Sequence, residues 1–280
     1  MIDEVQVDDD AGEPGPRHYR WALITVSYNS GEQLRHFWRA VDLGPDVEWI
    51  VVDNNSSDES VDVAKRLGAR VISLSENIGF GAANNVGFSA SASDYVGFIN
   101  PDIVVKAEDL SGLEEVIDNT GGLVAPQLTD PDGASQPNGR GYPFLLEKVR
   151  NRLERNDTAS TYRRIAKRGQ DLEVVWIMGA VVLGQRDQLQ SLGPWDERFF
   201  VYYEDSDLGL RAGALGIPCT VTGKFHWIHG WARETTSLRW APWKLEFPSM
   251  AKFYARYPRL LSPFPRITGR HFSKTGWPNP

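Results

Sequence analysis

The strongest constraint on the fold is an alternation of apolar runs with helix-length segments in the first part of the chain. Runs rich in Val, Ile and aromatic residues predict four buried strands, and turns rich in Gly, Asn or Ser interrupt them. The predicted strands are residues 21–28, 48–53, 70–74 and 95–100. Strands at this spacing pair in parallel, with helices on both faces of the sheet. The sequence therefore predicts an α/β fold with a Rossmann-like, mostly parallel sheet.

Three of these strands end in polar turns. The turns are Ser27-Tyr28-Asn29, Asp53-Asn54-Asn55 and Asn100-Pro101-Asp102. In sheets of this type, ligands bind beyond the carboxyl ends of the strands. We therefore expect the three turns to meet at one edge and to form a binding site there.

After Gly122 the regular alternation fades. Residues 174–183 predict one further buried strand, and residues 204–216 have a helical periodicity that ends at a Gly-Ile-Pro sequence. The charged stretch 144–168 suits a helix, either a lid or a docking element. We expect one domain over residues 19–222, with two halves divided near residue 128.

The two ends of the chain differ in charge. Residues 1–16 hold six acids and no Lys or Arg, so we expect a disordered acidic tail over residues 1–18. Residues 223–280 hold ten Lys or Arg against two acids, together with five of the ten tryptophans. This basic, aromatic extension is expected to pack, in part as helices, on the preceding domain. Contact with an anionic membrane surface is an alternative use of the same residues.

Several classes of protein are disfavoured by composition. The net charge of −7 and the acidic remainder of the chain argue against nucleic-acid binding. A single cysteine, Cys219, excludes an internal disulfide and suits a reducing compartment. There is no basic, apolar leader of the signal-peptide type, and the longest apolar run is well short of the roughly 20 residues of a membrane span. We expect a cytoplasmic protein, with contact to the inner face of the cell membrane as the open alternative.

Two aspartates at strand ends are candidates for chemistry. Asp53 would lie at the sheet edge, where its carboxylate could accept the ring N–H of uracil or thymine. A turn or helix cap explains the same residue equally well. Asp102 follows a proline that fixes its turn, and a carboxylate there could hold Mg²⁺ or Mn²⁺ beside a diphosphate. Asn-Pro-Asp is also an ordinary turn sequence.

A third acidic group, Glu204-Asp205-Ser206-Asp207, opens the predicted helix and follows a run of aromatic residues. Acids in a first helical turn are favoured by the helix dipole, so part of this group needs no catalytic role. The aromatic side chains would line a pocket in which a carboxylate acts as general base toward a sugar hydroxyl. Asp205 is our candidate among the three acids.

Two further patterns allow more than one interpretation. Gly79-Phe80-Gly81 with Asn84 nearly matches a dinucleotide fingerprint, but it follows the third strand and has Asn84 at the last glycine position. His226 and His229 are three residues apart, a spacing that would place both on one helix face as metal ligands. Packing within an aromatic segment is the alternative for each histidine.

The order of these segments resembles glycosyltransferase family 2, enzymes of the GT-A fold, and especially its rhamnosyltransferase-like members. The matching segments are TVSYNS at 25–30, VVDNNSSD at 51–58, ENIGFGAANNVG at 76–87, NPD at 100–102 and FFVYYEDSDLGLR at 199–211. Two positions depart from the family pattern. Asn100 replaces the first acid of the Asp-x-Asp element, and Trp231 stands where relatives commonly have glycine.

The resemblance implies an inverting transfer of a sugar such as rhamnose from a UDP- or dTDP-linked donor. The acceptor would be a hydroxyl of a saccharide or of a lipid-linked saccharide in cell-surface polysaccharide synthesis. The nucleotide would be contacted by Ser27, Asn29, Asp53, Asn55, Asn77, Gly79, Phe80, Asn84 and Asn100. Asp102 and His229 would hold Mg²⁺ or Mn²⁺, Asp205 would be the base, and Glu204, Tyr203, Trp176 and Gly179 would contact the acceptor.

Within this interpretation, residues 19–128 form the nucleotide-binding half of the catalytic domain and residues 129–222 the acceptor half. Two other functions stay open on sequence grounds. One is an NAD-dependent oxidoreductase that uses the glycine-rich loop. The other is a non-catalytic carbohydrate-binding protein in which aromatic residues stack on sugars. The sequence gives no oligomeric state.

Overall fold

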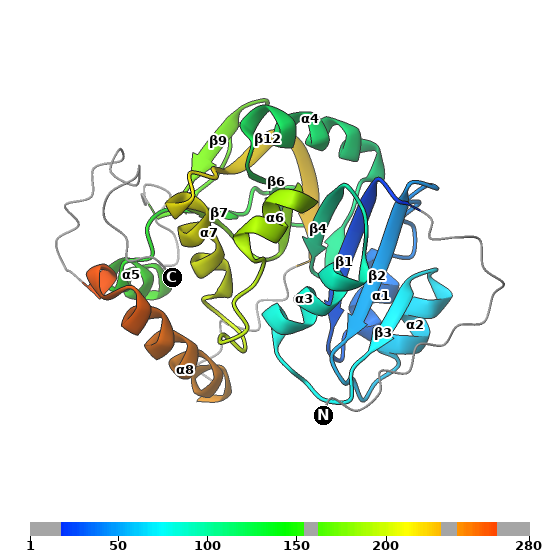
Figure 1. The fold of residues 1–280 in the computed structure, drawn as a ribbon, viewed down its shortest axis with the longest axis horizontal. Coiled ribbons are helices and arrows are strands. Elements are labelled where there is room, and N and C mark those ends of the chain that lie inside the picture. Colours follow the sequence, from blue (N-terminus) through cyan, green and yellow to red (C-terminus); the bar gives the residue numbers. More distant parts are fainter. Residues whose placement is uncertain (1–17, 154–161, 231–239, 262–280) are drawn as a thin grey trace.

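The computed structural model describes residues 18–153, 162–230 and 240–261 (Figure 1). Within these ranges, a central mixed sheet has the strand order β3-β2-β1-β4-β11-β6-β12-β5, and β9 pairs with β12 outside this path. A small second sheet has the order β10-β7-β8. The predicted acidic tail, apart from His18, lies outside the described residues, as does Trp231.

The strands of the central sheet are β1 (Trp21–Ser27), β2 (Val47–Asp53), β3 (Arg70–Ser73), β4 (Tyr95–Ile99), β5 (Ile103–Val104), β6 (Leu123–Thr129), β9 (Asp171–Val174), β11 (Val181–Gln185) and β12 (Cys219–His229). The small sheet consists of β7 (Gly139–Arg140), β8 (Arg163–Arg164) and β10 (Trp176–Ile177). β1 to β4 pair in parallel with one another, and β12 runs parallel to β6. The four strands predicted in the first part of the chain are confirmed.

The helices are α1 (Gly31–Phe37), α2 (Ser60–Arg66), α3 (Phe80–Ala90), α4 (Leu110–Thr120), α5 (Leu145–Leu153), α6 (Arg186–Leu192), α7 (Glu204–Ala214) and α8 (Trp240–Arg256). Single 3₁₀ turns, η1 (Ala107–Asp109) and η3 (Pro258–Leu261), complete the described elements. None of the helices in the described residues is long and apolar enough to cross a membrane.

Helices cover both faces of the first strands, as the parallel arrangement requires. Gly87 of α3 lies directly over Ile24, so closely that a Cβ there would come within 2.5 Å of the Ile24 side chain. Neighbouring residues of a strand face opposite sides. On the opposite face, Thr25 accepts a hydrogen bond from the Trp49 indole, which stacks on Trp38 at the end of α1. The strand β1 is therefore buried on both sides.

A second apolar cluster joins the C-terminal helix to the rest of the molecule. Phe253 and Tyr254 of α8 pack with Phe199 and Tyr203, which precede α7. Figure 1 shows α5 and α8 at the left, at the opposite end of the molecule from β1 to β3. These described aromatic side chains of the C-terminal segment thus pack on the preceding domain.

The second half of the chain differs from the sequence prediction in three places. The predicted single strand at 174–183 is three short strands, because the chain leaves one sheet for the other at Val175 and returns at β11. Among the described residues of the charged stretch 144–168, the helical ones are those of α5, and residues 163–164 form β8. The expected division between residues 222 and 223 falls inside β12, which continues along β6 past that point.

Candidate active site

The carboxyl ends of β1 and β2 place two polar side chains next to each other. Ser27 and Asp53 are paired positions in the ladder, and both side chains are buried. Asp53 Oδ2 accepts the backbone N–H of Ser56 at 2.9 Å. Asp53 Oδ1 and Ser27 Oγ have no hydrogen-bond partner among the described residues. A buried acceptor without a partner is costly, and this edge of the sheet therefore offers two polar atoms to which a donor group could bind.

The turns after β1 and β2 each contain an asparagine with a left-handed backbone conformation. Asn29 and Asn55 both have a positive φ, of 52° and 65°, a conformation that Asn tolerates better than most residues. The Asn29 side chain accepts the backbone N–H of Ser57 at 2.8 Å. The turns after β1 and β2 are therefore locked to each other, which holds the Ser27 and Asp53 edge in shape.

The loop before α3 is held by a residue that sequence reasoning did not select. Asn54 Oδ1 accepts the backbone N–H of Ile78, and its Nδ2 donates to Asn77 Oδ1 at 2.8 Å. Gly79 has φ 91°, and a Cβ there would lie 2.5 Å from the carbonyl oxygen of Phe200. Phe80 donates its backbone N–H to the same oxygen. This loop is thus pinned between the β2 edge and the segment before α7.

Asn84, another predicted nucleotide contact, lies inside α3 and is almost fully buried. Its side-chain amide donates to the carbonyl oxygen of Phe80, one helical turn earlier. The described hydrogen bond of the Asn84 side chain is therefore within its own helix.

The predicted metal ligands Asp102 and His229 do come together. His229 is at the end of β12, not on a helix, and β12 pairs with β5 immediately after Asp102. The two residues are 3.4 Å apart between His229 Nε2 and Asp102 Oδ2. His226 is three residues away on the same strand, so its side chain points to the opposite face. Of the two interpretations of this pair, the one with both histidines on one helix face is therefore wrong.

Gln136 orients the His229 ring, a role that no local sequence pattern indicates. Gln136 Nε2 donates to the carbonyl oxygen of His229, so the oxygen Oε1 is the atom 2.8 Å from His229 Nδ1. Nδ1 of His229 is therefore the donor to Gln136, and Nε2 is the ring nitrogen that faces Asp102. Histidines that bind metals in proteins commonly have their second ring nitrogen hydrogen-bonded to a neighbouring oxygen in this way.

The structure separates the three acids at the start of α7. Asp207 is fully buried and already occupied: it accepts hydrogen bonds from Arg211 at 2.7 Å and from the Tyr257 hydroxyl at 2.8 Å. Asp205 is half-buried, and its Oδ2 accepts the backbone N–H of Gly179 at 3.3 Å. Asp207 is a structural residue, whereas Asp205 faces the loop between β10 and β11.

Glu204 is the most perturbed acid of the group. Its side chain is buried, and Oε2 has no hydrogen-bond partner in the described part of the chain. Burial and the neighbouring Asp205 carboxylate raise the pKa of Glu204 to about 8. The protein thus holds a neutral carboxylic acid beside Asp205 at neutral pH.

Gly179 is the point at which these parts meet. A Cβ at Gly179 would lie within 3.7 Å of Asp205, Phe80 and Trp195. The next residue, Ala180, accepts the backbone N–H of Asn100, which begins the Asn-Pro-Asp turn. The Asp205 carboxylate, the loop before α3 and the turn that carries Asp102 therefore surround one short segment.

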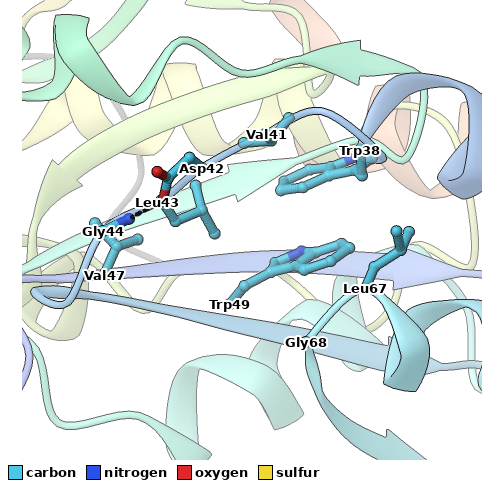
Figure 2. A pocket seen from close by; sticks show the side chains of 9 residues that line it. All are labelled: Trp38, Val41, Asp42, Leu43, Gly44, Val47, Trp49, Leu67 and Gly68. Atoms are coloured by element: carbon cyan, nitrogen blue, oxygen red, sulfur yellow. Dashed lines mark hydrogen bonds between the residues drawn. The ribbon is translucent and has the colours of Figure 1, made fainter.

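A surface hollow elsewhere is separate from this site. This hollow has a volume of about 240 Å³ and is lined by Trp38, Trp49, Leu67 and residues 41–44, among others (Figure 2). None of the predicted site residues lines it. Trp38 nevertheless supports the site, because its indole N–H donates to the carbonyl oxygen of Pro101.

The comparison with known families agrees with this geometry. The family model described as glycosyl transferase family 2 matches residues 22–168. The chain belongs to glycosyl transferase family 2. Its sequence is 27% identical to an N-acetylglucosaminyl-diphospho-decaprenol L-rhamnosyltransferase of Mycobacterium tuberculosis, over 69% of this chain and 70% of the relative. It is 26% identical to rhamnosyltransferase WbbL of Escherichia coli K12, over 66% and 72%. The chain is thus a rhamnosyltransferase-like family member.

Solved structures of glycosyltransferases share the fold. The mannosyltransferase PcManGT from Pyrobaculum calidifontis, in complex with GDP-Man and Mn²⁺, has a TM-score of 0.58 and 14% identity over 89% of this chain and 67% of that chain. Residues 1–349 of Staphylococcus aureus TarS have a TM-score of 0.54 and 16% identity, over 75% of this chain. The chain spans 60% of the length of that TarS structure. These neighbours establish the GT-A fold predicted from the sequence.

In this family 2 protein, the donor set for a metal is small. The described residues contain no group of three or more His, Cys, Asp or Glu placed to hold a metal ion. Asp102 and His229 supply one carboxylate oxygen and one imidazole nitrogen. Mg²⁺ and Mn²⁺ bound with nucleotides take much of their coordination from phosphate oxygens and water. Two protein ligands therefore fit a cation that binds together with a diphosphate.

Proposed function

We propose that this protein is an inverting glycosyltransferase that moves a sugar, rhamnose in the favoured case, from a UDP- or dTDP-linked donor onto a hydroxyl of a lipid-linked saccharide. The observation that carries the proposal is the meeting of Asp205, the Phe80 loop and the Asn100 turn around residues 179 and 180. It brings a half-buried carboxylate to the carboxyl edge of the sheet, where a nucleotide would bind.

The donor nucleotide would be held by the edge of β1 and β2. A uracil or thymine ring N–H would donate to Asp53 Oδ1, and the base would also meet Ser27 Oγ, so the two buried atoms that lack partners would both be satisfied. The turns with Asn29 and Asn55 would contact the ribose, and the loop of Asn77, Gly79 and Phe80 would lie along the nucleoside. Asn100 would lie beside the diphosphate.

Asp102 and His229 would hold Mg²⁺ or Mn²⁺. When bound there, the cation would neutralise charge on the leaving diphosphate. The protein's own contribution would be the orientation of the ligands: Gln136 contacts Nδ1 of His229, so that Nε2 faces Asp102. The Mn²⁺ in the PcManGT structure supports this assignment through the shared fold only.

Asp205 would act as the general base. Its carboxylate takes the proton of the acceptor hydroxyl while the acceptor oxygen attacks the anomeric carbon, and the bond from that carbon to the diphosphate breaks. Attack from the side opposite the diphosphate inverts the anomeric centre. Glu204, Tyr203, Trp176 and Gly179 would contact the acceptor, and neutral Glu204 could donate a hydrogen bond to a sugar oxygen.

The acceptor proposal draws on the relatives. The Mycobacterium tuberculosis relative is named for an N-acetylglucosaminyl-diphospho-decaprenol substrate, a lipid-linked sugar diphosphate. We propose an acceptor of the same kind here, with residues 19–128 as the nucleotide-binding half. The acceptor half then continues to the end of β12, and the basic extension begins after Gly230.

A lipid-linked acceptor requires access to a membrane surface. Leu146 and Val149 of α5 and Phe247 of α8 are large apolar side chains that are about half exposed. The basic residues of the C-terminal quarter would add attraction to anionic lipids. We propose peripheral contact through this end of the molecule. Co-sedimentation with anionic liposomes at low salt tests it, and the absence of binding would refute it.

The function is tested by a transfer assay with purified protein. UDP- and dTDP-linked sugars are offered with a prenyl diphosphate N-acetylglucosamine acceptor, with Mg²⁺, with Mn²⁺ or with EDTA. We expect a disaccharide product and free nucleoside diphosphate, both lost in EDTA. A thermal-shift panel of nucleotide sugars, with NAD as a rival ligand, accompanies it. Stabilisation by NAD and not by UDP or dTDP would favour an oxidoreductase instead.

A further inference from the structure

Two cations lie beside the acids of α7 and have no role in the mechanism described above. Arg140 is at the end of β7 and Lys148 is on α5. Both approach the indole of Trp176: the Arg140 guanidinium carbon lies 5.8 Å from the ring centroid, and Lys148 Nζ lies 5.3 Å from it. Two positively charged groups therefore lie close to the same aromatic ring.

Both cations are also close to Asp205. Lys148 Nζ donates to Ser206 Oγ at 3.2 Å, and the Ser206 hydroxyl and backbone N–H both donate to Asp205 Oδ1. Arg140 Nη2 lies 3.9 Å from the sulfur of Met178, the residue before Gly179. The two charges thus lie next to the proposed base.

Within the described part of the chain, neither cation is neutralised by a direct ion pair. Among the described residues, no carboxylate lies within ion-pairing distance of Arg140 or Lys148. Lys148 instead lies 3.6 Å above the ring of Tyr203. Burial lowers the pKa of Lys148 to about 8, against the nearby charges of Asp205 and two glutamates, and it also lowers the pKa of Arg140. The surroundings therefore penalise both charges more than they compensate them.

Positive charges retained in such surroundings suit an anionic ligand. Aromatic walls exclude water and strengthen the attraction between a cation and an incoming anion. Arg140 gives one hydrogen bond to a backbone oxygen and a weak one to sulfur, so most of its five N–H donors stay available within the described contacts. Guanidinium groups bind phosphate oxygens in a bidentate manner.

We propose that Arg140 and Lys148, on the Trp176 indole, form a subsite for the diphosphate group of the acceptor. This inference rests on the proposed function, whose acceptor is a lipid-linked sugar diphosphate. A diphosphate esterified at both ends carries two negative charges, which match the two cations. The donor diphosphate has its own partner in the cation of Asp102 and His229, whereas Arg140 and Lys148 come from the half of the molecule assigned to the acceptor.

The test compares two acceptors that differ only in the diphosphate. One is N-acetylglucosamine diphosphate with a short prenyl chain, and the other is the neutral glycoside of the same sugar with the same prenyl chain. For Lys148→Gln and for Arg140→Gln, we expect kcat/KM with the diphosphate acceptor to fall about 10- to 100-fold more than with the neutral acceptor. Lys148→Arg keeps the charge and should recover part of this loss.

The matched control is Lys224→Gln. Lys224 is an exposed lysine on β12 that pairs with Asp171 at 2.7 Å, away from Trp176. Lys224→Gln should leave the ratio of kcat/KM for the two acceptors unchanged. Equal losses on both acceptors in the Lys148 and Arg140 variants would overturn the subsite and indicate that they only position Asp205. A rise in the KM of the donor would assign the subsite to the donor and would also overturn the proposal.

A binding measurement separates this inference from the proposed function. In calorimetric titrations with EDTA present, inorganic pyrophosphate should bind to the wild type and to Lys224→Gln with a measurable heat. It should give no heat of binding with the double variant Arg140→Gln, Lys148→Gln. If the wild type transfers no sugar to either acceptor yet binds pyrophosphate in this way, the proposed function fails and the anion subsite stands. No difference between the double variant and the wild type would refute the subsite.

Discussion

Glu204 provides a prediction that can be made quantitative without any substrate. In an unfolded chain a glutamate has a pKa near 4.5, whereas burial and Asp205 raise the pKa of Glu204 in the folded protein to about 8. Between these two values the folded state holds a proton that the unfolded state has lost. The free energy of unfolding must therefore fall as pH rises through this window. Glu204→Gln removes the ionisable group and so removes this pH dependence.

The size of the effect follows from the two pKa values. Integrating the proton linkage between pH 5 and pH 7.5 gives a relative loss of about 3 kcal/mol for the wild type. For a chain of this size, that corresponds to roughly 6 to 10 °C in the melting temperature. We expect the melting temperature of Glu204→Gln, relative to the wild type, to rise by this amount from pH 5 to pH 7.5.

The assay is thermal unfolding across that pH range, with Glu115→Gln as the matched control. Glu115 is an exposed glutamate in the middle of α4, so its replacement removes the same charge without a buried environment. At each pH, the melting temperature of the wild type is subtracted from that of the variant. This difference cancels the contribution of all other titrating groups. A Glu204→Gln curve that runs parallel to the wild-type curve would show that Glu204 is ionised in the folded protein and would refute the reasoning.

Three further predictions follow from single contacts. Asp53→Ala should weaken binding of UDP or dTDP about 10- to 100-fold in calorimetric titration, since it removes a buried acceptor of a ring N–H. Unchanged affinity would show that the uracil or thymine ring does not bind at Asp53. Gln136→Leu should weaken Mn²⁺ binding to the nucleotide complex about 10- to 100-fold, measured by fluorescence or paramagnetic relaxation, because the His229 ring loses its orienting partner. Equal Mn²⁺ affinity in that variant would exclude His229 as a ligand. Tyr257→Phe should lower the free energy of unfolding in urea by about 1 to 3 kcal/mol, because Asp207 loses a hydrogen bond, with donor affinity retained; loss of donor affinity would give Asp207 a role beyond structure.

The first half of the fold could be predicted because its strands are buried on both faces. Such strands consist of continuous apolar runs, as in β1 and β2, and their polar ends mark the carboxyl edge of the sheet. The order of the five matching segments along the chain indicates the family. The family assignment was then confirmed by the match over residues 22–168.

The second half was predicted less well because its elements depend on distant partners. Residues 174–183 look like one strand, but Val174 ends a strand that pairs with β12, residues 176–177 pair with β7, and residues 181–183 pair with β4. His226 and His229 have a spacing that suits a helix, but both lie in strand β12, which pairs with β6 and β5. Short apolar segments do not reveal which neighbours they will pair with.

The candidate site shows the same limit at the level of side chains. Sequence alone could not assign separate roles to Glu204, Asp205 and Asp207. The structural role of Asp207 depends on hydrogen bonds from Arg211 and from Tyr257, and Tyr257 is fifty positions away in the sequence. Gln136 has no local pattern that would connect it with His229, from which it is 93 positions distant. The assignments of Asp53, Asp102 and Asp205 to base, metal and catalysis are still predictions.

The most direct test of the central claim is a comparison of donor binding and sugar transfer in Asp205→Asn. Asparagine keeps the shape of the side chain and can still contact Gly179, but it cannot take a proton. We predict that the variant binds the nucleotide sugar with an affinity within about threefold of the wild type, while kcat for transfer falls about 100-fold or more. Transfer at the wild-type rate would contradict the account by removing Asp205 as the base.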